Sequence, residues 1–220
     1  CMMTRAALSM SLPWKSIDSL GSIETTPEAK VDDQSDNLSG SAYRNFLAVL
    51  PISDGVVTIR AMSDEDAEAY AAGTGDALVR RFAHLPLEKY SPQIVRELIH
   101  SVIGAGLRDG TLAVLTIADS SSDSFLGSLV FFDINQDDAE IGYWVAPEHR
   151  GRKVSGRALA LALQISRILG LKRLRARTVQ DNPASERVLL NAGFKQEGEA
   201  RPEIVPSGKT EMSVSYLIEV

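Results

Sequence analysis

The segment from Ala139 to Arg157 constrains the fold of this chain more than any other. An apolar strand runs into a turn rich in arginine and glycine, and a helix rich in alanine and leucine follows. Amides at a helix start have no intrahelical partner, and the helix dipole adds about half a positive charge there. The segment therefore predicts a pocket for phosphate, with basic side chains around it at Arg150, Arg152, Lys153 and Arg157.

This order of strand, proline-containing turn, basic loop and helix resembles the acetyl-CoA loop of the GCN5-related N-acetyltransferase (GNAT) superfamily. Within it, the branch of the ribosomal-protein-alanine N-acetyltransferases is the most similar, because its strand carries the same Ile-Gly-Tyr-Trp run. A second segment, Gln180–Phe194, resembles the helix that follows in the family. The resemblance covers roughly residues 52 to 220. It implies an α/β (α+β) fold with a mixed, mostly antiparallel central sheet flanked by helices.

The resemblance also implies a set of residues that hold acetyl-CoA. They lie at the end of the strand, in the loop and at the next helix start: Trp144, Val145, Arg150, Gly151, Arg152, Lys153, Val154, Ser155, Gly156, Asn182 and Ser185. Asn182 and Ser185 are explained equally well as helix-capping residues.

Lys153 and Ser155 depart from the family pattern, because they stand where the family loop has its two small residues. Glycine at such positions allows a positive φ or a close approach to phosphate. A lysine held in strained backbone there costs about 1–3 kcal/mol. Alternatively, Lys153 keeps ordinary helical dihedrals and points its ammonium group at the pyrophosphate.

Glu140 is the candidate general base, because the family uses an acidic residue on this strand to take the proton of the amine. Alternation puts Glu140, Gly142 and Trp144 on one face, but the family strand carries a bulge that would break the alternation. The alternative for Glu140 is a solvated or substrate-orienting carboxylate.

Tyr143 is the candidate general acid. Relatives often carry a tyrosine in the helix of the second segment, and the matching position here is Leu189. Tyr143 is a possible substitute, and a core aromatic is the alternative. With no internal cysteine, direct attack of the amine on the thioester is simpler than transfer through an acetyl-cysteine.

The net charge of −6 argues against a general nucleic-acid binder. Nine basic residues and one acidic residue lie between Glu148 and Arg177, which suits a polyanionic cofactor and a cationic second substrate. The single cysteine, Cys1, indicates a reducing, cytoplasmic compartment. No apolar run reaches the length of a membrane span, and we expect no metal, because no group of ligands has a recognisable spacing.

We expect two regions: a weakly ordered extension over residues 1–42 and a GNAT-like domain over 43–220, whose first residues, 43–50, dock as a short helix or edge strand. The predicted strands are 56–60, 111–118, 125–132, 139–145, 173–178, 195–201 and 210–218, and the predicted helices are 64–72, 76–82, 92–108, 152–169 and 183–191. In helix 152–169 we expect Leu161, Ile165 and either Ile168 or Leu169 to be buried, with Gly170 as the stop.

The sequence therefore predicts an acyl-CoA-dependent N-acyltransferase that acetylates a primary amine of a protein N-terminus, a peptide or a small molecule. The alternative is a catalytically weak domain of the same fold that binds acyl-CoA or a partner. A nucleotide-dependent oxidoreductase is disfavoured, because the glycines lack the Gly-x-Gly-x-x-Gly order. The acceptor amine is not identified by any motif, and a homodimer is expected by family analogy alone.

Overall fold

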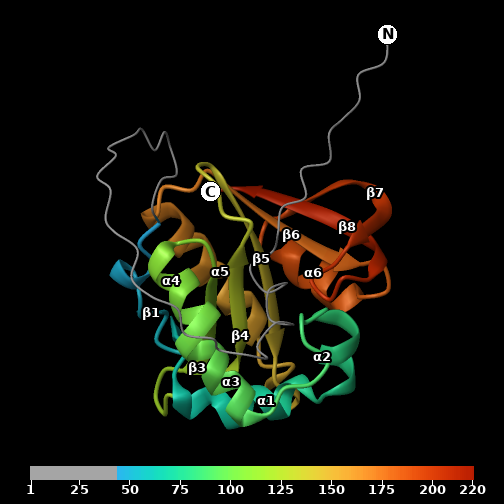
Figure 1. Cartoon of the computed structure of the whole chain (residues 1–220). Coiled ribbons are helices and arrows are strands. Elements are labelled where there is room, and N and C mark those ends of the chain that lie inside the picture. Colours follow the sequence, from blue (N-terminus) through green and yellow to red (C-terminus); the bar gives the residue numbers. More distant parts are fainter. Residues whose placement is uncertain (1–43) are drawn as a thin grey trace, which may run out of the picture. The chain divides into compact units, whose positions relative to one another are not determined.

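A single β-sheet forms the centre of the protein, for which a computed structural model describes residues 44–220. The expected extension over 1–42 lies outside the described residues. The strands are β1 (Ile52–Ser53), β2 (Val57–Ala61), β3 (Ala113–Asp119), β4 (Phe125–Phe132), β5 (Asp138–Val145), β6 (Arg173–Val179), β7 (Lys195–Ile204) and β8 (Thr210–Glu219). Their order in the sheet is β1-β2-β3-β4-β5-β6-β8-β7 (Figure 1). Neighbouring strands are antiparallel except β5 and β6, which confirms the predicted mixed sheet.

Helices flank the sheet, as predicted. They are α1 (Ala67–Thr74), α2 (Ala77–Phe82), α3 (Pro92–Leu98), α4 (Gly104–Asp109), α5 (Val154–Ile168) and α6 (Pro183–Asn191), with 3₁₀ turns η2 (Phe46–Ala48), η3 (Asp64–Asp66) and η5 (Pro147–His149). The helix predicted over 92–108 is divided, because the π-helical turn η4 (Ile99–Ile103) joins α3 to α4. Among the described residues, no helix has the length and apolarity needed to cross a bilayer.

Two apolar cores lie on the two faces of the sheet. On one face, α5 buries Leu161 and Ile165 against β2, β5 and β6, and Leu189 of α6 joins the same core. On the other face, α1 and α3 pack around Trp144 of β5. The alternation of side chains along β5 therefore decides which of its residues faces which group of helices.

Of the two alternatives for the end of α5, Leu169 packs against the core, whereas Ile168 is 62% exposed. One detail of the prediction was wrong. The expected bulge in β5 is not found, since β4 and β5 pair without a register shift from Phe132↔Glu140 to Gly127↔Val145. The irregularity lies one strand away, between Ile117 and Ala118 of β3.

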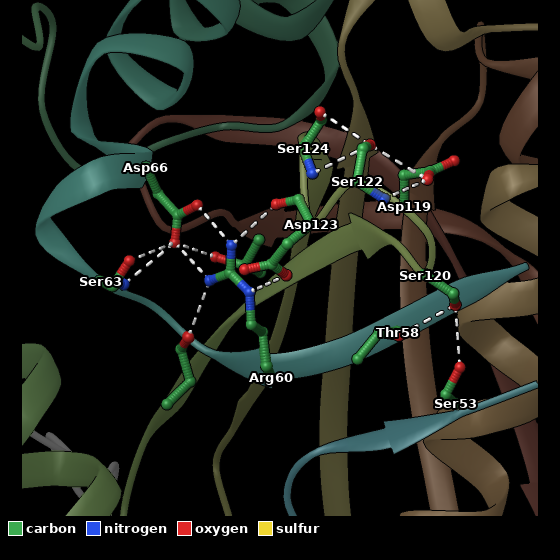
Figure 2. Close-up of polar contacts among 12 residues, drawn as sticks. Ser53, Thr58, Arg60, Ser63, Asp66, Asp119, Ser120, Ser122, Asp123 and Ser124 are labelled. Atoms are coloured by element: carbon green, nitrogen blue, oxygen red, sulfur yellow. Dashed lines mark hydrogen bonds and ion pairs between the residues drawn. The ribbon is translucent and has the colours of Figure 1, made fainter. Parts of the chain in front are cut away.

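A buried ion-pair network fixes the start of α1 to the sheet (Figure 2). The guanidinium of Arg60 on β2 donates to both carboxylate oxygens of Asp66, at 2.7 and 2.9 Å. Asp66 also accepts hydrogen bonds from the Ser63 amide and the Thr116 hydroxyl. Arg60 makes a second ion pair, with Asp123 of the β3–β4 turn, so three segments meet at one cation.

Candidate active site

The strands β5 and β6 separate in the middle of the sheet. Their parallel register runs from Asp138↔Arg173 to Ile141↔Ala176, but both strands continue beyond the last pair. The edge of β5 that faces β6 therefore has no strand partner from Gly142 onward within the described residues. Such an edge offers amides and carbonyls to an extended ligand. We call the point where pairing stops the vertex.

A loop at the open end of β5 leads into α5. Its backbone has positive φ at Gly151 (+75°) and at Lys153 (+62°), and Lys153 is the N-cap of α5. The suggestion that Lys153 keeps helical dihedrals was therefore wrong, and the predicted helix start at residue 152 moves to Val154. No described side chain caps the amides of Val154, Ser155 and Gly156. A Cβ at Gly151 or Gly156 would meet no atom within 4 Å, so the space around the loop is open.

Two of the four basic residues at this loop already have carboxylate partners. Arg150 is paired with Asp76, whose side chain also caps α2 by accepting from two of its amides. Arg157 is paired with Asp54 at 2.6 Å. Arg152 and Lys153 are exposed, and no ion pair to either is present in the part of the chain that the structure describes. Arg152 and Lys153 are thus the cations available to a phosphate in this conformation.

Glu140 lies beside the vertex, one residue before the last β5–β6 pair. It is 6% exposed, and its Oε1 accepts a hydrogen bond of 2.7 Å from Nε of Arg177. Burial raises the pKa of Glu140, and the charge of Arg177 opposes this rise. Glu140 shares its face with Trp144, as alternation predicts. This carboxylate is buried and paired, so a fully solvated role does not describe it.

Tyr143 lies on the opposite face of β5 and reaches α6. Its hydroxyl is 3.0 Å from the hydroxyl of Ser185. Burial raises the pKa of Tyr143 to about 12, so the phenol stays protonated at neutral pH. The Asn182 side chain accepts from the Ser185 amide, which is a capping contact. Leu189, at the position where relatives often carry tyrosine, is 1% exposed and packs in the core.

The side chain of Trp144 is a core group and not part of an open surface. It is 8% exposed and packs on Tyr70 of α1 with ring centroids 5.3 Å apart. A Cβ at Gly73 would lie 2.5 Å from the Trp144 ring, so glycine allows this close contact with α1. In this arrangement Trp144 can contact a ligand beside β5 through its backbone and not through its side chain.

The sequence reasoning missed Arg177 and Glu203. Arg177 also donates to Glu203 of β7, at 2.6 Å, so one guanidinium connects two carboxylates. A signal was present, because Arg173, Arg175 and Arg177 alternate along β6. Arginines that repeat on one face of an interior strand indicate carboxylates on the neighbouring strands.

A comparison with protein-family models finds a match over residues 57–195 to the family described as "Acetyltransferase (GNAT) domain". A curated relative, the uncharacterized N-acetyltransferase YoaA of Bacillus subtilis (strain 168), is 28% identical over 157 residues. That alignment covers 68% of this chain and 85% of the relative.

Solved structures with the same fold include two acetyltransferases. The ribosomal-protein-S5-alanine acetyltransferase of Vibrio fischeri is 17% identical with a TM-score of 0.66, over 77% of this chain and 96% of that one. The spermidine N-acetyltransferase of Vibrio cholerae, in complex with CoA and spermine, is 20% identical with a TM-score of 0.63, over 76% and 96%. At these identities the likeness is one of fold.

Proposed function

The chain belongs to the GNAT acetyltransferase family, and we propose that it transfers acetyl from acetyl-CoA directly to a primary amine at the vertex of β5 and β6. We assign this role to the whole region 43–220. The observation that carries the proposal is the vertex itself: an unpaired edge of β5 lies between a buried carboxylate on one face and a buried phenol on the other.

The loop between β5 and α5 has the features needed to bind the cofactor. The uncapped amides of Val154, Ser155 and Gly156 and the open space around the loop suit a pyrophosphate. Arg152 and Lys153 supply free cations. We assign the contacts with the pantetheine arm to Ser185, at the start of α6, and to the backbone edge of β5.

Acetyl-CoA brings an acetyl group that is already activated as a thioester, so the chain has to orient the amine and move protons. We assign to Glu140 the removal of the ammonium proton, directly or through water. Tyr143, on the other face of β5, is the proton donor for the departing thiolate. The support for this assignment is the position of the phenol on β5 beside α6, within hydrogen-bond distance of Ser185.

The acceptor amine approaches from the face that carries Glu140. Relatives of the same fold are described as acting on a ribosomal protein and on spermidine, so both a protein N-terminus and a small amine remain candidates. We also propose that the protein forms a homodimer and works in the reducing environment of the cytoplasm. A catalytically weak domain that only binds acyl-CoA or a partner is the competing function, because Lys153 and Leu189 depart from the family pattern.

The test is the release of free CoA thiol from acetyl-CoA with a panel of peptides, polyamines and aminoglycosides. We expect at least one amine to raise the release above the rate without acceptor, with an equal amount of N-acetylated product by mass spectrometry. CoA binding by calorimetry without acetylation of any amine in the panel would support the competing binding function.

Replacing Lys153 by glycine should change stability and cofactor affinity in opposite directions. A non-glycine residue at φ +62° carries strain of about 1–2 kcal/mol, so Lys153→Gly should raise the melting temperature. The same change removes one of the two free cations, so the affinity for CoA should fall and its salt dependence should flatten. Thermal melts and calorimetry at two salt concentrations measure the two effects.

Lys153→Ala is the matched control. It removes the charge but keeps a Cβ in the strained conformation, so it should weaken CoA binding without the gain in stability. Tighter CoA binding by Lys153→Gly would contradict the charge role and show that the lysine is a poor substitute for glycine.

A further inference from the structure

A chain of ion pairs crosses the sheet at the vertex. Glu140 of β5 pairs with Arg177 of β6, Arg177 pairs with Glu203 of β7, and Glu203 pairs with Arg201 of the same strand. Arg177 is the first β6 residue beyond the last β5–β6 pair, while Glu140 is one residue before it. The first ion pair therefore joins the two strands where they separate.

The ion pairs can extend from β6 to β7 because β8, which lies between these two strands, carries small side chains opposite Arg177 and Arg201. Arg177 pairs in register with Ser215, and Arg201 pairs with Ser213. Paired residues share a face of the sheet, so both serines lie on the face that carries Arg177 and Glu203. The Arg177 side chain can cross β8 above them and reach Glu203 at 2.6 Å.

Glu140 needs a cation in order to stay charged. Its side chain is 8% exposed, and a buried carboxyl without compensation takes up a proton near neutral pH. Within residues 44–220 the charged groups that act on it are Arg177 and Arg175 of β6 and Asp133 after β4, and of these Arg177 forms an ion pair with it. Glu203 draws on the same guanidinium, so it competes with Glu140 for the charge of Arg177.

We propose that Arg177 is a positioning residue that fixes the Glu140 carboxylate at the vertex and keeps it ionised, and that Glu203 moderates this effect. The inference rests on the proposed role of Glu140 as the base that takes the amine proton. It gives β6 and β7 a function in the reaction, since residues that do not touch the amine set the pH range in which the base works.

The proposal predicts that two variants, Arg177→Gln and Glu203→Gln, shift the pH profile of the reaction in opposite directions. The measurement is kcat/KM for the amine against pH, whose acid limb reports the free enzyme. Arg177→Gln removes the cation, so the acid limb should move up by about 1 pH unit or more. Glu203→Gln removes a negative charge near Glu140, so that Glu140 no longer shares the charge of Arg177. The acid limb should therefore move to lower pH, by a smaller amount.

The pKa of the substrate amine is the same in every assay, so a difference between the acid limbs of two variants reports a change in the enzyme. Arg177→Lys keeps the positive charge but loses the planar guanidinium that donates to two carboxylates. This variant should have a lower turnover, while the acid limb of its pH profile stays near the wild-type position. General damage to the fold would lower the rates without producing shifts of opposite sign. If Arg177→Gln does not fold, the direction of the Glu203→Gln shift decides.

Limbs that do not move, or that move in the same direction, would overturn the role of Arg177. Failure of the proposed function has a different signature. Wild-type turnover by Glu140→Gln at every pH would remove the base itself. A Glu140→Gln enzyme that has lost its activity, together with unmoved limbs, would remove only the inference on Arg177 and Glu203.

Discussion

Glu140→Gln is expected to lower turnover near neutral pH by about 10²–10⁴-fold, the usual contribution of a positioned base. The amine is protonated in this range and must lose a proton before it attacks the thioester. Glutamine has nearly the same shape and can keep a hydrogen bond to Arg177, but it cannot take the proton. The dissociation constant of acetyl-CoA, measured by calorimetry, should hardly change, because Glu140 lies at the vertex and not at the basic loop.

The defect of Glu140→Gln should become smaller at high pH, where more of the amine is already neutral. Asp138→Asn is the matched control. Asp138 lies on the same face of β5, two residues farther from the vertex, and is also paired with an arginine, Arg173, at 2.6 Å. We expect that variant to turn over at close to the wild-type rate. Equal losses for the two variants would point to damage of the strand rather than loss of a base.

Asp66→Ala is expected to reduce the free energy of unfolding by about 3–5 kcal/mol, the cost of breaking a buried ion pair on one side. Asp66 is 2% exposed and accepts two hydrogen bonds from Arg60 (Figure 2). Its removal leaves the exposed Asp123 as the carboxylate that pairs with Arg60 in the described part of the chain, and it frees the start of α1, which packs on Trp144. Urea denaturation followed by circular dichroism measures the loss.

Asp123→Ala supplies the control for that prediction, because Asp123 pairs with the same guanidinium but its side chain is 69% exposed. An exposed pair contributes at most about 1 kcal/mol, so this variant should stay close to the wild type. If both variants lose equal stability, burial of the Asp66 pair is not the cause.

The Asp66 network also predicts how wild-type stability depends on pH. Burial raises the pKa of Asp66, but the hydrogen bonds from Arg60, Ser63 and Thr116 outweigh it, and the net pKa lies below the ordinary value. A lowered pKa in the folded state means that the contribution is complete above the unfolded pKa and is lost as pH falls through the folded one. In Asp66→Ala this part of the acid sensitivity should be absent.

Local patterns predicted most of the fold. The bounds of β4 and α6 match the prediction, because β4 is an apolar run between two turns and α6 begins at an Asn-Pro cap. The two-residue strand β1 was missed, since Ile52 and Ser53 are too short to show alternation and are held by pairing with β2. The π-helical turn η4 was also missed, since the pattern of residues 92–108 was read as one continuous helix.

The candidate site was predicted less completely, because long-range charge pairing is not visible in a local pattern. Arg150 and Arg157 were grouped with the cofactor cations, yet Asp76 and Asp54, which lie far away in sequence, pair with them. The role of Glu140 as the general base stays a prediction, and its pairing with Arg177 was not foreseen because it depends on the parallel register of β5 and β6.

A crystal structure of the protein with CoA tests the central claim most directly, because the claim assigns the reaction to the vertex of β5 and β6. We predict that the pyrophosphate lies against the amides of Val154, Ser155 and Gly156. The pantetheine arm should follow the unpaired edge of β5, and the thiol should lie at the vertex between Glu140 and Tyr143. A CoA molecule whose thiol lies away from this vertex would contradict the account.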